Sequence, residues 1–270
     1  MRDELTEALL ENYYFAPFCE MFKTVFGLRV MRILKPSPRL DAFVGFDQGW
    51  ARITVGVSEF LKELQGAVSR GDKSVSTMYF AYFLQYKCVE AVLRKSASVP
   101  PYLRPPCYRV PLSLKPNKVT AMSQHETMMR LNEIRGSEVV YACPMIFGEE
   151  SLHDEPDIDD VRLVPISTAP PGFLSTEKHY VYFRDKNDPT PFWCSEPTEG
   201  ASYHAREWAW QSRSKLLNSR ELAKFLAELE GVFRLRKGYP RERWLRSCAG
   251  RYSHMLRIVE LGHPSDEGSG

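Results

Sequence analysis

The chain has 270 residues, of which 43% are hydrophobic and 12% aromatic, and its formal net charge is +2. This length and composition suit one large domain, or a domain with an extension, and exclude an intrinsically disordered chain. No apolar stretch reaches the roughly 18 residues of a membrane-spanning helix, and Met1–Leu5 carries acids where a signal peptide would be basic. We therefore expect a soluble cytoplasmic protein with no membrane partner.

The six cysteines are spread along the chain, and no two lie close enough to form a Cys-x-x-Cys pair. This spacing argues against a zinc finger or ribbon. A disulfide framework is not expected at this chain length, so we expect the cysteines to be reduced.

Charge is distributed unevenly along the sequence. Residues 149–160 contain seven acids among twelve positions, whereas residues 203–257 contain thirteen Lys or Arg against five Asp or Glu. An excess of positive charge suits a polyanion such as nucleic acid. Solvated helix faces would have the same composition, so both interpretations stay open.

The first half of the chain predicts alternating helices and strands. The aromatic run over residues 77–87 indicates a buried strand, and Ser123 followed by Glu126 is the capping-box signature of a helix start. The expected elements are a helix over 3–27, strands over 50–57, 77–87, 107–112 and 138–145, and helices over 59–68 and 123–135.

The second half predicts strands followed by helices. After an acidic loop at 149–160, we expect strands over 161–166, 179–183 and 191–195, and helices over 201–217, 219–231 and 241–259. The tail over 261–270 is expected to be disordered. The sequence thus predicts an α/β (mixed α+β) fold with a mixed sheet flanked by helices. Its core covers 1–148, and residues 161–260 extend the sheet and add a basic helical section.

Asp47, Gln85 and Lys87 form a coherent set of polar residues at the ends of expected strands. Because side chains alternate along a strand, Gln85 and Lys87 lie on one face of the strand over 77–87. Mg²⁺ prefers oxygen ligands, which Asp47 and Gln85 offer, and Lys87 is suited to hold water or to stabilise a charged transition state. The set predicts a metal-dependent phosphodiesterase with Mg²⁺ or Mn²⁺ as cofactor. An exposed strand end with a solvent-directed lysine is the alternative.

Two acids on the first expected helix complete this set. Glu7 and Glu11 are four residues apart, so they share one helix face and either could join the site. A helix with a Glu, followed by Asp and then Gln-x-Lys on consecutive strands, resembles the PD-(D/E)xK nuclease superfamily. More narrowly, it is similar to Gln-x-Lys variants among Mrr-type restriction endonucleases.

That resemblance spans residues 3–145 in outline and implies a restriction-endonuclease-like sheet. It also implies that Asp47 and Gln85 bind the metal, that a helical Glu assists and that Lys87 positions water. The sequence departs from the family pattern because Gln85 replaces an acid and no proline directly precedes Asp47. Positions 47 and 85 are also 38 residues apart, which is a long gap. An inactive nuclease-like core would show the same features.

A second resemblance is carried by five short motifs, which are residues 83–87, 107–109, 124–125, 140–144 and 195–197. Together they are similar to a set of uncharacterised bacterial proteins from defence-type gene neighbourhoods. This likeness covers most of the chain. It implies a role in bacterial anti-phage or restriction-type defence.

Several basic residues are candidate contacts to a nucleic acid backbone. Arg109 follows a proline-rich loop over 99–106, although an ordinary surface arginine is the alternative there. The other candidates lie in the basic section, and they are Arg206, Arg213, Lys215, Arg236 and Lys237.

The sequence therefore favours a Mg²⁺-dependent endonuclease acting on DNA, or else RNA, as a homodimer or with protein partner subunits. The alternative is an inactive sensor or adaptor subunit of a defence assembly, docking through the acidic loop and Phe192-Trp193. A nucleic-acid binder without an active site is a third hypothesis. A thiol nucleophile made by Cys194 with His179 or His204 is the weakest one.

Overall fold

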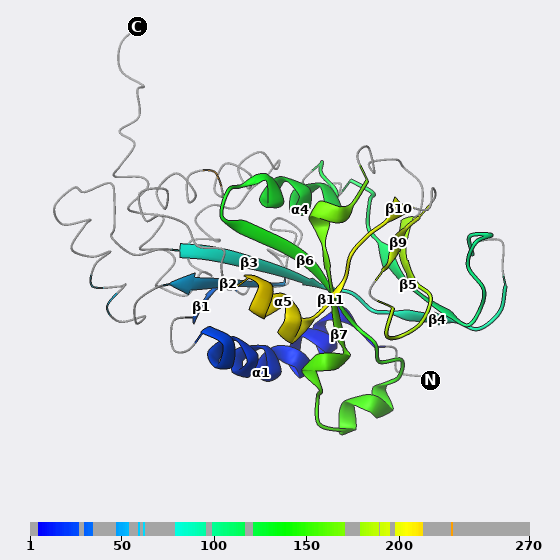
Figure 1. Ribbon diagram of the computed structural model, residues 1–270, viewed down its shortest axis with the longest axis horizontal. Coiled ribbons are helices and arrows are strands. Elements are labelled where there is room, and N and C mark those ends of the chain that lie inside the picture. The colour runs from blue at the N-terminus through cyan, green and yellow to red at the C-terminus, as the bar shows by residue number, and fades with distance from the viewer. Residues whose placement is uncertain are drawn as a thin grey trace, which may run out of the picture.

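The structure is a computed structural model that describes residues 5–26, 30–34, 47–53, 59, 62, 79–95, 99–116, 121–170, 179–188, 190–194, 198–212 and 228. Within these residues the fold consists of two sheets with helices packed on them (Figure 1). The prediction of a mixed α+β protein is confirmed at this level.

The larger sheet has six strands in the order β1-β2-β3-β6-β7-β11. All neighbours pair antiparallel except β3 and β6, which are parallel. The strands are β1 (Val30–Leu34), β2 (Gln48–Ile53), β3 (Tyr79–Tyr86), β6 (Ser137–Pro144), β7 (Val161–Pro165) and β11 (Tyr203–His204). The strands β7 and β11 thus extend a sheet that begins in the first half of the chain.

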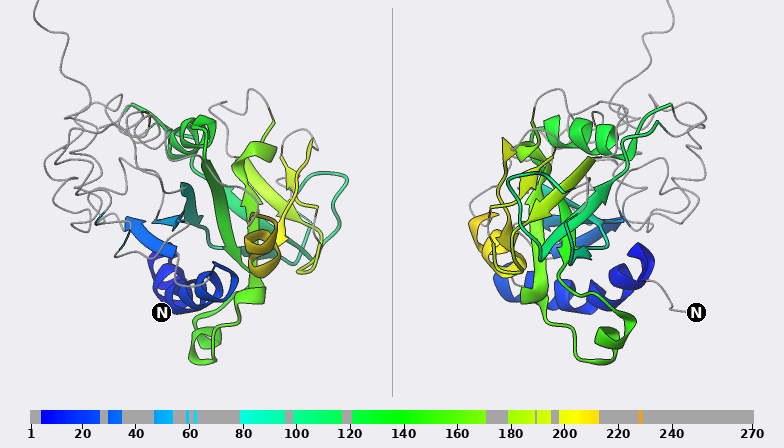
Figure 2. Two further views of the ribbon diagram at one scale, coloured as in Figure 1. Left: turned by 60° about the vertical axis from the view of Figure 1, so that its left-hand side comes forward. Right: turned by 90° about the vertical axis from the view of Figure 1, so that its right-hand side faces the viewer.

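Helices cover both faces of this sheet (Figures 1 and 2). The helices α1 (Glu7–Phe26) and α5 (Ala205–Gln211) lie on one face, and α4 (Gln124–Glu133) lies on the other. Residues 81–86 of β3 are all buried, as expected for a strand covered on both sides. Tyr82, Leu84 and Tyr86 pack in the core beneath α1, so the residues that alternate with them point to the opposite face of the sheet.

Aromatic side chains form the centre of the core under α1. Phe22 lies within 5.1 Å of Trp50, 5.8 Å of Tyr82 and 6.2 Å of Trp208, measured between ring centroids. These four rings come from a helix, two strands and a second helix, so their burial holds α1 and α5 on the same sheet face.

The last described segment is attached to the beginning of the parallel strand pair. Trp208 donates from Nε1 to Glu138 Oε1 at 2.8 Å, and Ser212 donates from Oγ to Glu138 Oε2 at 3.1 Å. Tyr82, which pairs with Glu138 in the sheet, donates from its hydroxyl to the Ser212 carbonyl at 3.4 Å. These contacts fix the C-terminal end of α5 on the sheet.

The smaller sheet is antiparallel and has five strands in the order β10-β9-β8-β5-β4. They are β10 (Thr198–Glu199), β9 (Phe192–Trp193), β8 (His179–Phe183), β5 (Cys107–Leu112) and β4 (Glu90–Val92). Each sheet therefore contains strands from both sides of residue 148. The chain enters the smaller sheet after β3 and returns through α4 to β6.

The acidic segment 149–160 contains two short 3₁₀ helices, η1 (Glu149–His153) and η2 (Ile158–Asp160), where a loop was expected. Tyr13 of α1 donates to the carbonyls of Ser151 and Asp154 at 3.0 and 2.6 Å. This segment is thus folded against α1, which a local reading of its charges does not predict.

The strands predicted at 77–87, 107–112, 138–145, 161–166 and 179–183 are confirmed within two residues. The helix predicted at 123–135 is also confirmed, and Ser123 Oγ accepts a hydrogen bond from the Glu126 backbone at 3.0 Å. Strand β1 was not predicted, β2 begins at Gln48 instead of residue 50, β9 begins at Phe192 instead of residue 191, and α5 begins at Ala205 instead of residue 201.

Several predictions lie outside the described residues. They concern the helix at 241–259, the tail at 261–270, and all of 59–68 and 219–231 except Glu59, Lys62 and Glu228.

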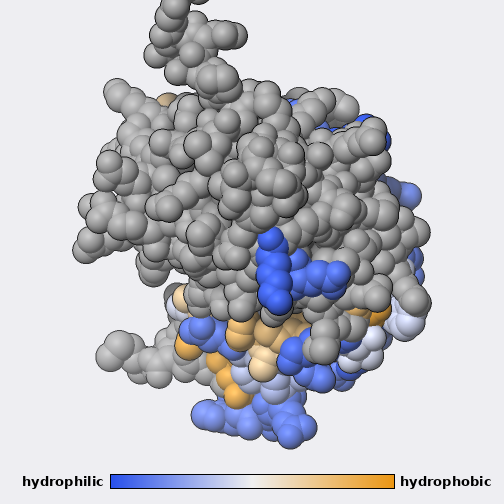
Figure 3. Space-filling view, turned by 90° about the vertical axis from the view of Figure 1, so that its left-hand side faces the viewer, coloured by the Kyte–Doolittle hydropathy of each residue, from blue (hydrophilic) through white to orange (hydrophobic). Residues whose placement is uncertain are grey.

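Among the described helices, none combines the length and apolar character needed to cross a membrane. Figure 3 shows the face that lies on the left of Figure 1. Below the grey atoms, hydrophobic and hydrophilic residues lie next to one another on that face.

Candidate functional site

The pairing of β2 with β3 brings Asp47 beside the end of β3. Gln48 pairs with Leu84 in the sheet, and the Asp47 backbone N–H donates to the Leu84 carbonyl at 2.9 Å. Antiparallel pairing therefore closes the gap of 38 residues between Asp47 and Gln85.

Asp47 and Gln85 are in direct contact in the interior. Gln85 is fully buried and donates from Nε2 to Asp47 Oδ2 at 2.9 Å. The same carboxylate oxygen accepts the Tyr86 backbone N–H at 2.7 Å. The Asp47 side chain is thus held at the strand end by two hydrogen bonds, and it points toward Gln85.

Lys87 lies one step beyond the strand and is only 4% exposed. Its Nζ atom donates to Glu7 Oε1 at 2.7 Å and to Gln124 Oε1 at 2.9 Å. Its backbone N–H donates to the Ala142 carbonyl at 2.9 Å, which continues the pairing with β6. Lys87 therefore joins the N-terminal turns of α1 and α4 at one end of the sheet.

Glu7 connects the two halves of this cluster. Its Oε2 atom lies 3.4 Å from Gln85 Nε2, while its Oε1 atom pairs with Lys87. The Glu7 side chain is 42% exposed, whereas the residues it contacts are buried. It is therefore the member of the cluster that opens toward solvent.

Glu11 occupies a different place, although it shares a helix face with Glu7. It is 9% exposed, and the amide nitrogen of Gln48 lies 3.5 Å from both its carbonyl oxygen and its Oε1 atom. Among the two helical acids that sequence reasoning left open, Glu7 is the one that contacts Gln85 and Lys87.

The cluster offers carboxylate and amide oxygen atoms, which are the type of ligand that a hard divalent cation binds. The carboxylates of Asp47 and Glu7 are close enough to share the Nε2 atom of Gln85. The Gln85 Oε1 atom is buried and has no hydrogen-bond partner among the described residues, which is unusual for a buried acceptor. Two carboxylates and a free amide oxygen match the ligands that Mg²⁺ takes in proteins.

This set of donors carries few negative charges for a metal site. Within the described ranges, no three His, Cys, Asp or Glu side chains gather in the way a metal centre requires. The amide of Gln85 stands where the family pattern has an acid, and its nitrogen faces the carboxylates. Binding of a cation there would require Gln85 to turn its oxygen toward them.

Gln124 was marked in the sequence only as part of the motif at 124–125, and the structure places it in the site. It is the first residue of α4, and its amide oxygen accepts from Lys87 at 2.9 Å. The capping motif at Ser123 located the helix start, but it gave no register between α4 and β3. That register depends on the path of the chain through the smaller sheet.

The predicted nucleic-acid contacts that the structure describes are already engaged within the chain. Arg109 lies 2.6 Å from Glu90 and stacks 4.8 Å above the ring of Tyr180. Arg206 lies 3.2 Å from Asp159. Arg213, Lys215, Arg236 and Lys237 lie outside the described residues.

The thiol hypothesis has a partial counterpart in the smaller sheet. Cys194 Sγ lies 3.8 Å from His179 Nδ1, whereas His204 Nδ1 lies 2.8 Å from the Asp159 carbonyl. Cys194 and His179 are 7% and 4% exposed. Reactive cysteines usually lie in partly exposed, electropositive surroundings, so burial favours a packing role for this pair.

His125 also lies in the interior. Its Nδ1 atom lies 2.8 Å from the Tyr141 hydroxyl, and its ring is 1% exposed. Burial, and then the neighbouring His179, lowers the pKa of His125 from 6.5 to about 4. The ring is therefore neutral at physiological pH and packs between the sheet and Trp193.

Comparison with protein-family models, with curated proteins and with solved structures found no match for this chain.

Proposed function

We propose that this protein is a Mg²⁺-dependent nuclease that hydrolyses phosphodiester bonds in DNA, with RNA as the alternative substrate. The observation that carries the proposal is the contact of buried Lys87 with Glu7, which itself shares the Gln85 amide with Asp47. Removing an ammonium group from water has a free-energy cost of several kcal/mol even when it is paired. A buried lysine at a strand end therefore indicates that its charge has a use.

The order of elements supports a restriction-endonuclease-like fold as part of the proposal. An acid before β2, Gln-x-Lys at the end of β3 and a glutamate on α1 meet at one end of the sheet. The crossover through α4 makes β6 parallel to β3. This arrangement agrees with what the PD-(D/E)xK resemblance implies, and the sequence motifs alone did not require it.

The chain's own residues would act as follows. Asp47 and Glu7 would hold the cation through carboxylate oxygens, and Gln85 would add its amide oxygen. When bound, Mg²⁺ neutralises charge on the scissile phosphate and lowers the pKa of an attacking water.

Lys87 would contribute a hydrogen-bond donor. An ammonium has three N–H groups, and two of those of Lys87 are used by Glu7 and Gln124. The third can reach a water or a phosphate oxygen, where a preorganised positive charge stabilises the developing negative charge.

A second candidate is a catalytically inactive sensor or adaptor with the same core. One observation favours it: the Gln85 Nε2 atom donates hydrogen bonds to both facing carboxylates, so the amide is turned as a donor toward them and not as a metal ligand. A role in anti-phage defence, as an enzyme or as an adaptor, rests on the resemblance to bacterial defence-associated proteins.

The test is a cleavage assay with plasmid DNA and with RNA, at matched Mg²⁺ and EDTA, on the wild type, Lys87→Met and Lys95→Met. Lys95 is an exposed lysine, which makes it the matched control. We expect Lys87→Met to lose about 10²–10³-fold in rate, as when a preorganised electrostatic donor is removed, and Lys95→Met to lose nothing.

Lys87→Met should melt close to the wild type, because methionine fills the same space and Glu7 can be hydrated. Equal rates for Lys87→Met and the wild type would contradict the proposal. A wild type that cleaves neither substrate in Mg²⁺ or Mn²⁺ would favour the adaptor.

A further inference from the structure

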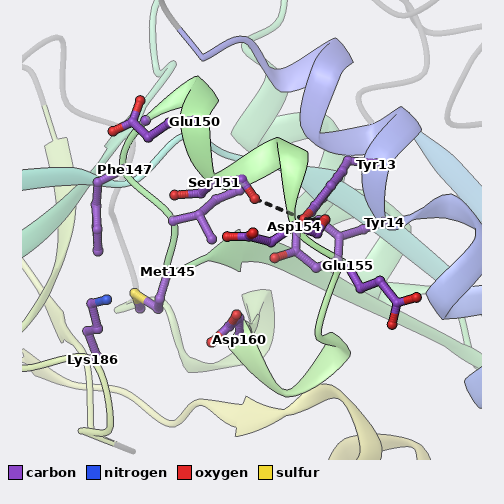
Figure 4. Close-up of a pocket in the computed structure, with 12 residues that line it drawn as sticks. Tyr13, Tyr14, Met145, Phe147, Glu150, Ser151, Asp154, Glu155, Asp160 and Lys186 are labelled. Carbon is purple, nitrogen blue, oxygen red and sulfur yellow. Dashed lines mark hydrogen bonds between the residues drawn. The ribbon is translucent and has the colours of Figure 1, made fainter.

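A cavity of about 410 Å³ lies between α1 and the acidic segment 149–160, apart from the cluster around Lys87. Figure 4 shows Tyr13 and Tyr14 of α1 on one side of it, with Phe147 and Lys186 on the other. Pockets for small ligands usually measure about 300–1,000 Å³, so this one can hold a small molecule or a single side chain.

The wall of this cavity is strongly acidic. It carries four carboxylates, from Glu150, Asp154, Glu155 and Asp160, against one ammonium, from Lys186. All four acids are exposed to solvent. In Figure 4, Asp154 and Asp160 face the middle of the cavity, and Glu150 and Glu155 lie at its edges. Such an excess of negative charge attracts a cation.

The backbone that carries the acids nearest the middle is held in place before any ligand binds. The Tyr13 hydroxyl donates to the backbone carbonyls of Ser151 and Asp154. The Asp160 carbonyl accepts the Met145 N–H at 2.9 Å, and its own N–H donates to Asp157 at 3.1 Å. A wall fixed in this way loses little conformational entropy when a ligand binds.

Lys186 shows which kind of cation the cavity tolerates. Its Nζ atom lies 4.9 Å from the centroid of the Phe147 ring, within the range of a cation–π contact. Partial burial and then Asp157 raise the pKa of Asp160 above its usual value, and the Lys186 charge acts in the opposite direction. An alkylammonium thus already lies between an aromatic face and the acidic wall.

Tyr14 adds an independent observation at the floor of the cavity. Its side chain is fully buried, and its hydroxyl has no hydrogen-bond partner among the described residues. Buried hydroxyl groups are nearly always hydrogen-bonded in folded proteins. In Figure 4 the ring runs from α1 toward the side where Asp154 lies. An N–H donor of a bound ligand would satisfy this oxygen.

We propose that this cavity binds a primary alkylammonium group, supplied either by a free diamine or polyamine or by a lysine side chain of a partner protein. Asp154 and Asp160 would pair with the charge, Phe147 would contact the alkyl chain and Tyr14 would accept a hydrogen bond. A metal ion fits less well, because no cluster of His, Cys, Asp or Glu suited to a metal occurs in the described part of the chain.

The test is isothermal titration calorimetry on the full chain, with cadaverine as the free diamine and Nα-acetyl-lysine methylamide as the side-chain probe. Nε-acetylated lysine methylamide, which lacks the charge, is the ligand control. We expect Asp160→Asn to weaken binding about tenfold through loss of a charge-assisted contact, and Glu155→Gln, at the edge, about threefold. Glu133→Gln, an exposed acid on α4, should bind as the wild type does.

Lys186→Met should have the opposite effect and tighten binding about threefold, because it removes the competing internal charge. Tighter binding of cadaverine would identify a free amine as the ligand, and tighter binding of the lysine derivative would identify a protein side chain. The proposal is overturned if neither probe binds, if the acetylated control binds equally, or if Glu133→Gln weakens binding as much as Asp160→Asn. Should Asp160→Asn unfold, Glu155→Gln and Lys186→Met still decide the matter.

Discussion

Helix α1 serves two polar regions that manage charge in opposite ways. At its first turn, Glu7 pairs with a lysine that is 4% exposed, and the buried groups around them are hydrogen-bonded to one another. Two turns later, Tyr13 and Tyr14 border the acidic cavity, whose four carboxylates face one ammonium. A buried charge must be paired, whereas a charge that stays in contact with water does not.

This comparison separates two kinds of acid on the protein. Glu7 is needed by its partner, because Lys87 would be a buried charge without it. The acids of the cavity stay exposed to solvent, and among the described residues that line it they share one cation, Lys186, which leaves negative charge available to an external cation. The predictions below test that distinction, beginning with the largest effect.

The strongest test replaces one acid in each region. Glu7→Gln should reduce Mg²⁺-dependent cleavage about 10²–10³-fold and destabilise the fold by about 1–3 kcal/mol, because Lys87 is left buried without its counter-charge. Glu155→Gln should change neither. Cleavage rates and urea denaturation of both variants test this prediction. Similar losses in the two variants would show that the acids of the two regions do not differ in this way.

Acid should destabilise the interior through His125. Its pKa falls from 6.5 to about 4 on folding, so between these values the unfolded chain binds more protons. This contribution to stability is complete above pH 6.5, decreases as the pH falls and is lost below pH 4, for a total of about 3 kcal/mol.

His125→Asn keeps a polar group near Tyr141 but does not titrate. Urea denaturation at pH 7, 5.5 and 4 should therefore show a smaller acid-induced loss in His125→Asn than in the wild type. An equal loss of stability with falling pH in the two proteins would mean that folding does not lower the pKa of His125.

Adding the acid that the PD-(D/E)xK pattern has at this position should strengthen the proposed metal site. Gln85→Glu places a carboxylate where the amide now bridges Asp47 and Glu7. Three facing carboxylates repel one another without a cation, so Mg²⁺ should stabilise this variant more than the wild type, by about tenfold in affinity. The shift of the melting temperature across a Mg²⁺ titration measures this difference in affinity. Glu133→Gln is the control for a change of charge elsewhere. An unchanged midpoint in all Mg²⁺ concentrations would contradict the assignment.

The smallest effect concerns Tyr14. Removal of a buried hydroxyl that has no partner among the described residues can be neutral or slightly stabilising. The free energy of unfolding of Tyr14→Phe should therefore lie within about 1 kcal/mol of the wild-type value. Tyr13→Phe should be less stable than Tyr14→Phe, because Tyr13 holds the acidic segment through two hydrogen bonds. The reverse order in chemical denaturation would show that the Tyr14 hydroxyl is satisfied.

The sequence predicted the strand that carries the site better than it predicted the partners of that strand. The aromatic run located β3, and alternation placed Gln85 and Lys87 on one face, because these are local properties of the chain. The contact with Asp47 was proposed from the chemistry of the three side chains and had no local signal, since it depends on antiparallel pairing across a gap of 38 residues.

Other parts of the site had no local signal. Nothing near Glu7 or Glu11 indicates which of them reaches Lys87, because the rotation of α1 on the sheet is set by the aromatic cluster around Phe22. The folded state of the acidic segment was missed for a similar reason: its contact with Tyr13 spans 138 residues of sequence.

The attachment of Ser212 to Tyr82 and Glu138 fixes where α5 ends relative to Lys87. Tyr82 lies five residues before Lys87 along β3, and at 3.3 Å per residue this places the anchor about 16 Å from the lysine along the strand. The C-terminal end of α5 is therefore held at the end of β3 opposite to the cluster around Lys87, and the same strand carries both.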